Sequence, residues 1–232
     1  MDEIGAILLS GGIGSRAGIA MPKQFYLLGG KPIIVHSLEK LESIPAVTKA
    51  IIPSPAEWID KTQEILDGWS FDSRFSCISG GATRQESVLI ALQALSKAGY
   101  KQVIIHEAVR PFVSSDDFIQ LLENENANAM YGIEIPFTVV RGEDALEGIL
   151  IRDKLTNVQL PQIFDYDLIC KAHIWAKEHG RHYTEDASLL YDFDDSLKIS
   201  IIKGRDENIK ITYPLDLEFA ELIYEKKIRG GI

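Results

Sequence analysis

Short apolar runs alternate with amphipathic segments along almost the whole chain, and this alternation constrains the possible folds more than any other feature. The apolar runs are typical of buried strands and span 5–9, 47–54, 74–79, 101–107, 129–136 and 197–204. The amphipathic segments carry apolar residues at three- and four-residue intervals, which predicts helices over 31–43, 56–69, 83–99, 114–126, 166–180 and 214–228. Alternation of this kind implies crossover connections and a mostly parallel sheet covered by helices on both faces.

The 232 residues contain no repeat, linker or low-complexity segment, so we assign residues 1–232 to one Rossmann-like, three-layer α/β domain. Residues 136–162, "PFTVVRGEDALEGILIRDKLTNVQLPQ", interrupt the alternation with short β-prone pieces and a Gly-Glu-Asp turn. We predict that they form a β-arm that projects from the central sheet. An ordinary surface excursion is the alternative.

Composition excludes several classes of function. The formal net charge of −10 argues against a surface for nucleic acid, which needs a basic stripe, but it permits a small anionic substrate. No apolar stretch approaches the ~20 residues that span a membrane, and the acidic amino terminus does not resemble a secretory signal. Cys77 and Cys170 lie far apart and suggest neither a disulfide framework nor a zinc site. We therefore expect a cytoplasmic protein.

A glycine cluster, "GIGSRA" over 12–17, follows the first predicted strand. It fits the G-x-G-x-x-G/A dinucleotide pattern, but Gly18 and Pro22 interrupt the helix that this fingerprint requires, and no acidic strand end follows. It also lacks the Gly-Lys-Ser/Thr of a P-loop. The remaining interpretation is an open loop whose amides bind a phosphate chain, with Arg16 and Lys23 supplying charge. A plain turn is the alternative.

Six segments along nearly the whole chain resemble the cytidylyltransferases that act on polyol phosphates, the family of 2-C-methyl-D-erythritol 4-phosphate cytidylyltransferase and ribitol-5-phosphate cytidylyltransferase. They are "LLSGGIGSRAGIAMPKQF", "GGATRQESV", "HEAVRPF", "LPQIF", "TEDAS" and "NIKIT". The resemblance implies a fold like that of nucleotide-diphospho-sugar transferases. It also implies an enzyme that transfers CMP from CTP to a small polyol phosphate and releases pyrophosphate.

The resemblance implies a role for individual residues. Arg16 and Lys23 would stabilise the transition state and the pyrophosphate leaving group. Arg152 and Lys210 would hold the acceptor phosphate. The nucleotide site would be lined by Leu9, Ser10, Gly11, Gly12, Gly14, Gly81, Arg84, Ser87 and Ala108.

The resemblance also implies a metal and a partner. Glu107 takes the position of the family's metal-binding aspartate and would hold Mg²⁺ or another divalent cation. A homodimer through the arm is implied as well. A related nucleotidyltransferase with another base or sugar phosphate is one alternative function, and a catalytically silent nucleotide-binding paralogue is another.

Structural interpretations compete with these roles. Glu107 and Arg110 are spaced for an ion pair, and Lys210 has Asp206 and Glu207 close by in the sequence. We interpret His106 as a packed, structural side chain. Three further histidines lie on or after one predicted helix and are assigned to helix-end roles and not to a metal site; they are His173, His179 and His182.

The chain departs from the family pattern at three places. Glu107 replaces the usual aspartate, Val139-Val140 replaces the common Asp-Thr of the arm, and Leu160 replaces the threonine of Thr-Pro-Gln. The last two changes lie where the family contacts its polyol or its partner subunit. The sequence therefore leaves the identity of the acceptor open.

Overall fold

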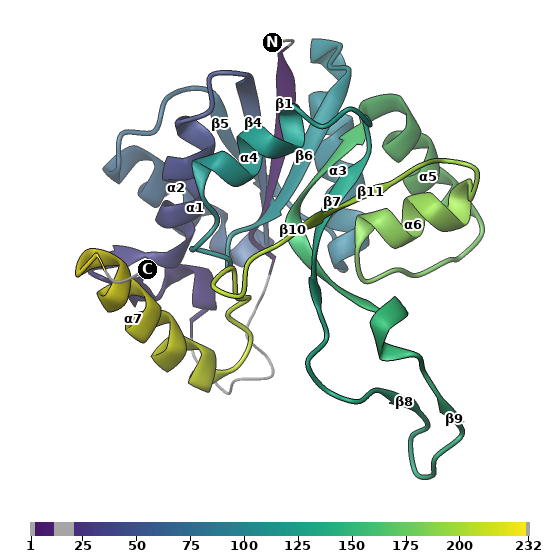
Figure 1. The fold of residues 1–232 in the computed structure, drawn as a ribbon. Helices are drawn as coiled ribbons and strands as arrows, with labels where there is room; N and C mark the ends of the chain where they lie inside the picture. Colours follow the sequence, from purple (N-terminus) through teal and green to yellow (C-terminus); the bar gives the residue numbers. More distant parts are fainter. Residues whose placement is uncertain (1–2, 12–20, 231–232) are drawn as a thin grey trace.

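A computed structural model describes residues 3–11 and 21–230. Within them, seven strands form one sheet in the order β11-β7-β10-β6-β1-β4-β5 (Figure 1). Four neighbouring strands are mutually parallel, namely β6 (Gln102–Glu107), β1 (Ile4–Leu9), β4 (Val47–Ser54) and β5 (Phe75–Ser79). Every residue of β1 is buried, because helices cover both faces of a parallel sheet.

The two faces of the sheet are covered by different helices (Figure 1). Ala6 and Leu8 of β1 face a core built with α1 (Ile33–Glu42), α2 (Ile59–Gly68) and α4 (Ser115–Leu122). Ile7 and Leu9 face the opposite core, which contains α3 (Arg84–Leu95), α5 (Tyr166–Glu178) and α6 (Asp186–Phe193). The predicted three-layer α/β class is confirmed.

Strand β10 (Thr156–Asp165) corrects the predicted boundary of the arm. It lies in the sheet between β6 and β7 (Ala129–Glu134) and runs antiparallel to both, so the last residues of the predicted arm, 156–162, belong to the core. The pattern was misleading because Gln159 and Gln162 are polar yet buried, and Pro161 interrupts the apolar run. The pairing with β7 shifts register between these two glutamines.

The arm itself projects from the sheet as a long loop between β7 and β10 (Figure 1). It contains a two-stranded ladder of β8 (Val140–Arg141) and β9 (Gly148–Ile149), followed by a single 3-10 turn, η4 (Arg152–Lys154). Large apolar side chains along it are exposed, among them Phe137 and Ile149 at 75% and 83%. Most of the arm therefore lies outside either core.

The remaining elements are the last strand of the large sheet, a small separate hairpin, the C-terminal helix and short 3-10 turns. Strand β11 (Ser200–Lys203) pairs with β7 in parallel. Helix α7 (Pro214–Ile228) packs on the small hairpin of β2 (Leu27–Leu28) and β3 (Lys31–Pro32). Short 3-10 turns occur at η1 (Lys23–Phe25), η2 (Ala56–Trp58) and η3 (Ser96–Ala98). No helix in the described ranges is long and apolar enough to cross a membrane.

Candidate active site

A cavity of about 530 Å³ opens where β1 and β6 end. This is the edge of an open α/β sheet at which ligands generally bind. Nine of the residues predicted for the site line the cavity, namely Leu9, Ser10, Gly11, Lys23, Gly81, Arg84, Ser87, Glu107 and Lys210. Sequence positions up to 201 residues apart thus meet in one place.

Of the other five predicted residues, three lie outside the described residues and two, Ala108 and Arg152, are not part of that wall. Gly12, Gly14 and Arg16 lie outside the described residues. Ala108 is fully buried beneath the cavity, where its amide N–H donates to the carbonyl of Leu9 at 3.0 Å. Arg152 lies in η4 on the arm and does not line the cavity of its own chain.

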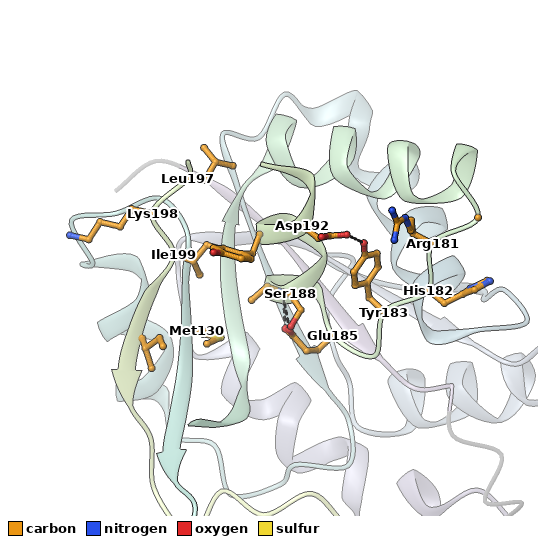
Figure 2. A pocket seen from close by; sticks show the side chains of 14 residues that line it. Met130, Arg181, His182, Tyr183, Glu185, Ser188, Asp192, Leu197, Lys198 and Ile199 are labelled. Atoms are coloured by element: carbon orange, nitrogen blue, oxygen red, sulfur yellow. Dashed lines mark hydrogen bonds between the residues drawn. The ribbon is translucent and has the colours of Figure 1, made fainter. Parts of the chain in front are cut away.

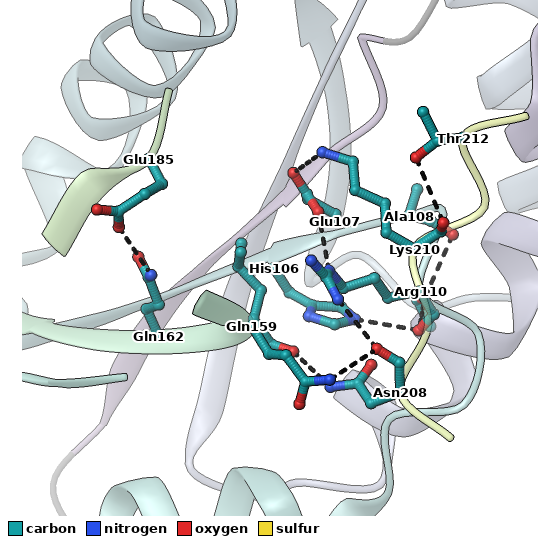
Figure 3. A network of polar contacts seen from close by, with 12 residues as sticks. His106, Glu107, Ala108, Arg110, Gln159, Gln162, Glu185, Asn208, Lys210 and Thr212 are labelled. Atoms are coloured by element: carbon teal, nitrogen blue, oxygen red, sulfur yellow. Dashed lines mark hydrogen bonds and ion pairs between the residues drawn. The ribbon is translucent and has the colours of Figure 1, made fainter. Parts of the chain in front are cut away.

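Glu107 is the acidic residue of the cavity wall, and Figure 3 shows the cations that it contacts. It ends β6 with its side chain only 7% exposed, and its two oxygens accept from Lys210 Nζ at 2.7 Å and Arg110 Nε at 2.9 Å. The Nε of Arg84 lies 3.7 Å away. Burial alone would raise the pKa of Glu107, but these three cations lower it to about 2. The carboxylate is therefore ionised at neutral pH.

The structure decides two of the competing ion-pair interpretations. The predicted pair of Glu107 with Arg110 is present. Lys210, however, pairs with Glu107 and not with its sequence neighbours Asp206 or Glu207. One carboxylate oxygen of Glu107 therefore accepts from the buried Arg110, and the other accepts from the half-exposed Lys210.

Arg110 fixes the segment that carries Lys210 (Figure 3). Its Nη1 donates to the carbonyl of Asn208 at 3.0 Å, and the side chain of Asn208 donates to the carbonyl of Leu160 at 2.7 Å. These bonds join the segment after β6 and the middle of β10 to the chain just before Lys210. Neither Arg110 nor Asn208 was predicted as a site residue, although both lie in family segments, "HEAVRPF" and "NIKIT".

The loop before α3 forms a second wall. Thr83 caps the helix by accepting from the amide of Glu86, and Ser87 Oγ accepts from the amide of Gly81 at 3.1 Å. A Cβ at Gly81 would meet the Cβ of Glu86 at 2.4 Å, so only glycine allows this close approach. On the facing side, Gln24 Nε2 donates to the carbonyl of Ser10 at 2.7 Å and fixes the end of β1.

The histidines are held by local partners. His106 is fully buried, edge-on to Phe118, and burial lowers its pKa to about 3, so it remains neutral, as a structural histidine should. His173 differs from the expected helix-end role, because it lies inside α5 and contacts Asp186 at 3.1 Å. His179 does follow the helix end. The described residues contain no group of three or more histidine, cysteine or acidic side chains placed to hold a metal.

Sequence reasoning missed part of the cavity wall. Tyr183, Thr184 and Thr212 line it, and the last two lie in the segments "TEDAS" and "NIKIT" whose side chains could have been considered. Tyr183 also lines a second cavity of about 870 Å³ beside α6, where its hydroxyl donates to Asp192 (Figure 2). Among the described residues, none of the predicted site residues lines this second cavity.

A cation-rich cavity at the carboxyl edge of a parallel sheet suits a polyanionic ligand, and with this fold it defines the class of α/β nucleotidyltransferases. The family model IspD, 2-C-methyl-D-erythritol 4-phosphate cytidylyltransferase, matches residues 4–226. The chain therefore belongs to this family, and it is a CTP-dependent nucleotidyltransferase.

Individual relatives agree with the family assignment. The chain is 35% identical over 230 residues to a 2-C-methyl-D-erythritol 4-phosphate cytidylyltransferase of Clostridium acetobutylicum, covering 95% of this chain and 97% of that one. It is 30% identical to a ribitol-5-phosphate cytidylyltransferase of Lactiplantibacillus plantarum, covering 96% and 98%. The crystal structure of 4-diphosphocytidyl-2C-methyl-D-erythritol synthase from Anaerococcus prevotii matches with a TM-score of 0.84 at 25% identity, covering 97% and 99%.

Proposed function

We propose that the protein transfers CMP from CTP to the phosphate of a small polyol phosphate. An oxygen of the acceptor phosphate bonds to the α-phosphorus of CTP, and the bond to pyrophosphate breaks. The observation that carries the proposal is the cavity whose wall contains three cationic residues, Lys23, Arg84 and Lys210, the last two of which pair with the ionised Glu107. Relatives of both acceptor types match along nearly the whole chain, so 2-C-methyl-D-erythritol 4-phosphate and ribitol 5-phosphate are the two candidate acceptors.

The acid–base character of the cavity supports a nucleophile that is already ionised. Glu107 is the one carboxylate among the described lining residues, and with a pKa of about 2 it is a poor proton acceptor at neutral pH. The phosphate of the acceptor is already an anion at neutral pH, so it needs no base to act as the nucleophile. Catalysis then depends on bringing two polyanions together and stabilising the charge at the α-phosphate. Lys23, with the predicted Arg16, serves the transition state, and Lys210 serves the acceptor phosphate.

We also propose that Glu107 holds a Mg²⁺ ion together with the triphosphate. Mg²⁺ usually takes one or two carboxylates and completes its coordination with phosphate oxygens and water, so an ionised carboxylate in the cavity wall fits it. The metal supplies charge neutralisation on the phosphates. Lys210 is 44% exposed at its side chain and can leave the carboxylate for a phosphate, whereas Arg110 is buried and keeps its bond.

The arm supports a proposal of dimerisation. Contiguous exposed apolar residues on a small protein generally mark an interaction surface, and the arm exposes Phe137, Leu146, Ile149 and Ile151. Arg152 contacts only the carbonyl of Pro136 at 3.4 Å and Asp153 at 3.7 Å among the described residues. A second copy of the chain would cover the apolar face, and Arg152 would then serve the acceptor phosphate in the cavity of the partner.

We further propose a cytoplasmic location, consistent with the two free cysteines.

Pyrophosphate release tests the function directly. The purified protein is assayed with CTP, UTP, ATP or GTP, each with either candidate acceptor, in the presence and absence of Mg²⁺. We expect turnover with CTP and one of the two acceptors, and only with the metal. Equal rates with the other nucleotides would instead support a related nucleotidyltransferase, and binding of CTP without turnover of any acceptor would support a silent paralogue.

A further inference from the structure

Arg84 lies between two carboxylates that come from distant parts of the chain. Its Nη2 donates to Asp186 Oδ2 at 2.7 Å, while its Nε is 3.7 Å from Glu107. The first contact is a direct charge-assisted hydrogen bond, and the second is a looser ion pair without a hydrogen bond. The Nε of Arg84 is buried and has no hydrogen-bond partner among the described residues. The guanidinium is therefore held mainly from the side of α6.

Asp186 does not reach the cavity itself. Its side chain is 1% exposed, and it is absent from the described cavity wall that Arg84 lines. Burial would raise its pKa, but Arg84 and His173 hold the pKa of this carboxyl well below its usual range. A buried carboxylate with a direct bond to a cavity-lining arginine, but no access to the cavity, can affect a ligand only through that arginine.

His173 supports Asp186 from the next helix. Its Nε2 lies 3.1 Å from Asp186 Oδ1, and both side chains are buried. Because an ionised carboxylate only accepts hydrogen bonds, the proton must be on Nε2 of the histidine. The contact joins α5 to α6 and fixes the carboxylate oxygen that Arg84 does not use. The result is a connected series, His173–Asp186–Arg84, that runs from the core to the cavity.

We propose that Asp186 is a positioning residue for Arg84, with His173 as its support. Asp186 holds the guanidinium on the cavity wall and keeps it from closing fully onto Glu107, where it would compete with Lys210 and with the proposed metal. The inference rests on the proposed function and on the place in the nucleotide site that the family resemblance implies for Arg84. It assigns to α5 and α6 a part in nucleotide binding, although neither Asp186 nor His173 touches the cavity.

The variant Asp186→Asn tests this role, because it keeps the size of the side chain but removes its charge. We expect the KM for CTP to rise about tenfold, with little change in kcat or in the KM for the acceptor. Asp165→Asn is the matched control, since Asp165 caps α5 by accepting from the amide of Leu168, whereas the carboxylates that act on Arg84 are Asp186, Glu107 and Glu185. The control should lower the melting temperature and leave the KM for CTP unchanged.

Three further variants guard against a merely structural explanation. His173→Gln keeps a donor for Asp186 and should retain the wild-type KM, whereas His173→Leu removes the donor and should raise it. In an Arg84→Ala background, Asp186→Asn should have no further effect on the KM for CTP. An unchanged KM in Asp186→Asn, or an additive effect in the Arg84→Ala background, would overturn the inference. Failure of the wild-type enzyme to use CTP would instead overturn the proposed function.

Discussion

The end of strand β6 and the arm hold their charged side chains in opposite ways. Glu107 is almost fully buried and bonded by Arg110 and Lys210, whereas the side chain of Arg152 is half-exposed and, among the described residues, touches only its own arm. Hydrogen bonds and burial fix the first group before any ligand binds. The second group lacks that support within the described chain. The floor of the cavity, where Glu107 lies, is thus preorganised, whereas the arm would gain such support only in the proposed dimer.

The largest effect on activity is expected from removing the negative charge of Glu107. Glu107→Gln should lower kcat by about 100-fold or more, because the proposed metal and Lys210 both lose their carboxylate. The melting temperature should fall as well, since the buried Arg110 loses its counter-charge. Glu107→Asp should retain a substantial part of the activity. A magnesium titration of the rate measures both variants, and wild-type activity at the same half-saturating magnesium in Glu107→Gln would remove this residue from the site.

A smaller effect is expected on the arm. Arg152→Ala should raise the KM for the acceptor about tenfold and leave both the KM for CTP and the melting temperature unchanged, since the side chain is exposed and carries no core contact. Lys210→Ala removes the other cation proposed to hold the acceptor phosphate, and it should also raise the KM for the acceptor. Steady-state kinetics with the acceptor varied at saturating CTP checks the pair. An unchanged acceptor KM in Arg152→Ala would contradict a role for the arm in the site.

The apolar side of the arm can be tested without touching its charge. Ile149→Asp places a carboxylate on a side chain that is 83% exposed, so it should weaken the dimer several-fold and leave the fold of each chain intact. Ile174→Asp, on the exposed side of α5, is the control and should not change the assembly. Light scattering over a dilution series measures the association. A mass near one 25.9 kDa chain for the wild type at micromolar concentration would argue against the dimer itself.

The smallest expected effect is a dependence of stability on pH, which arises at the buried His106 beside Glu107. The pKa of His106 falls from 6.5 to about 3 on folding, so the unfolded chain binds the extra proton between these values. Its stabilising contribution is complete above pH 6.5 and is lost as the pH falls, by at most about 1.4 kcal/mol per pH unit. Urea unfolding at pH 7 and pH 5 measures it. His106→Gln should show a smaller difference between the two, and an equal difference would contradict the assignment.

The sequence predicts the layers of this fold because its parallel strands contain continuous apolar runs, which span all of β1 and residues 103–105 of β6. It does not predict β10, because the two buried glutamines of that strand bond to partners that no local pattern reveals, such as Gln159 Nε2 to the carbonyl of Arg205. The same limit applies to the site. Glu107 and Arg84 are found from motifs, but the pairing of Arg84 with Asp186 joins residues 102 positions apart.

The position of Arg152 on an arm outside its own cavity has a genetic consequence. Under the proposed exchange of arms, each active site is assembled from two copies of the chain. At any one site, the arm therefore comes from one copy and the cavity from the other. When an Arg152→Ala chain is co-expressed with a Lys210→Ala chain, each mixed dimer contains one site that carries both defects and one that carries neither. Random pairing should therefore leave about a quarter of all sites intact, so that at acceptor concentrations well below KM the mixture is more active than either parent, each of which has a raised KM for the acceptor. Alleles of this protein would then complement one another, which is a behaviour that alleles of a self-contained monomer do not show.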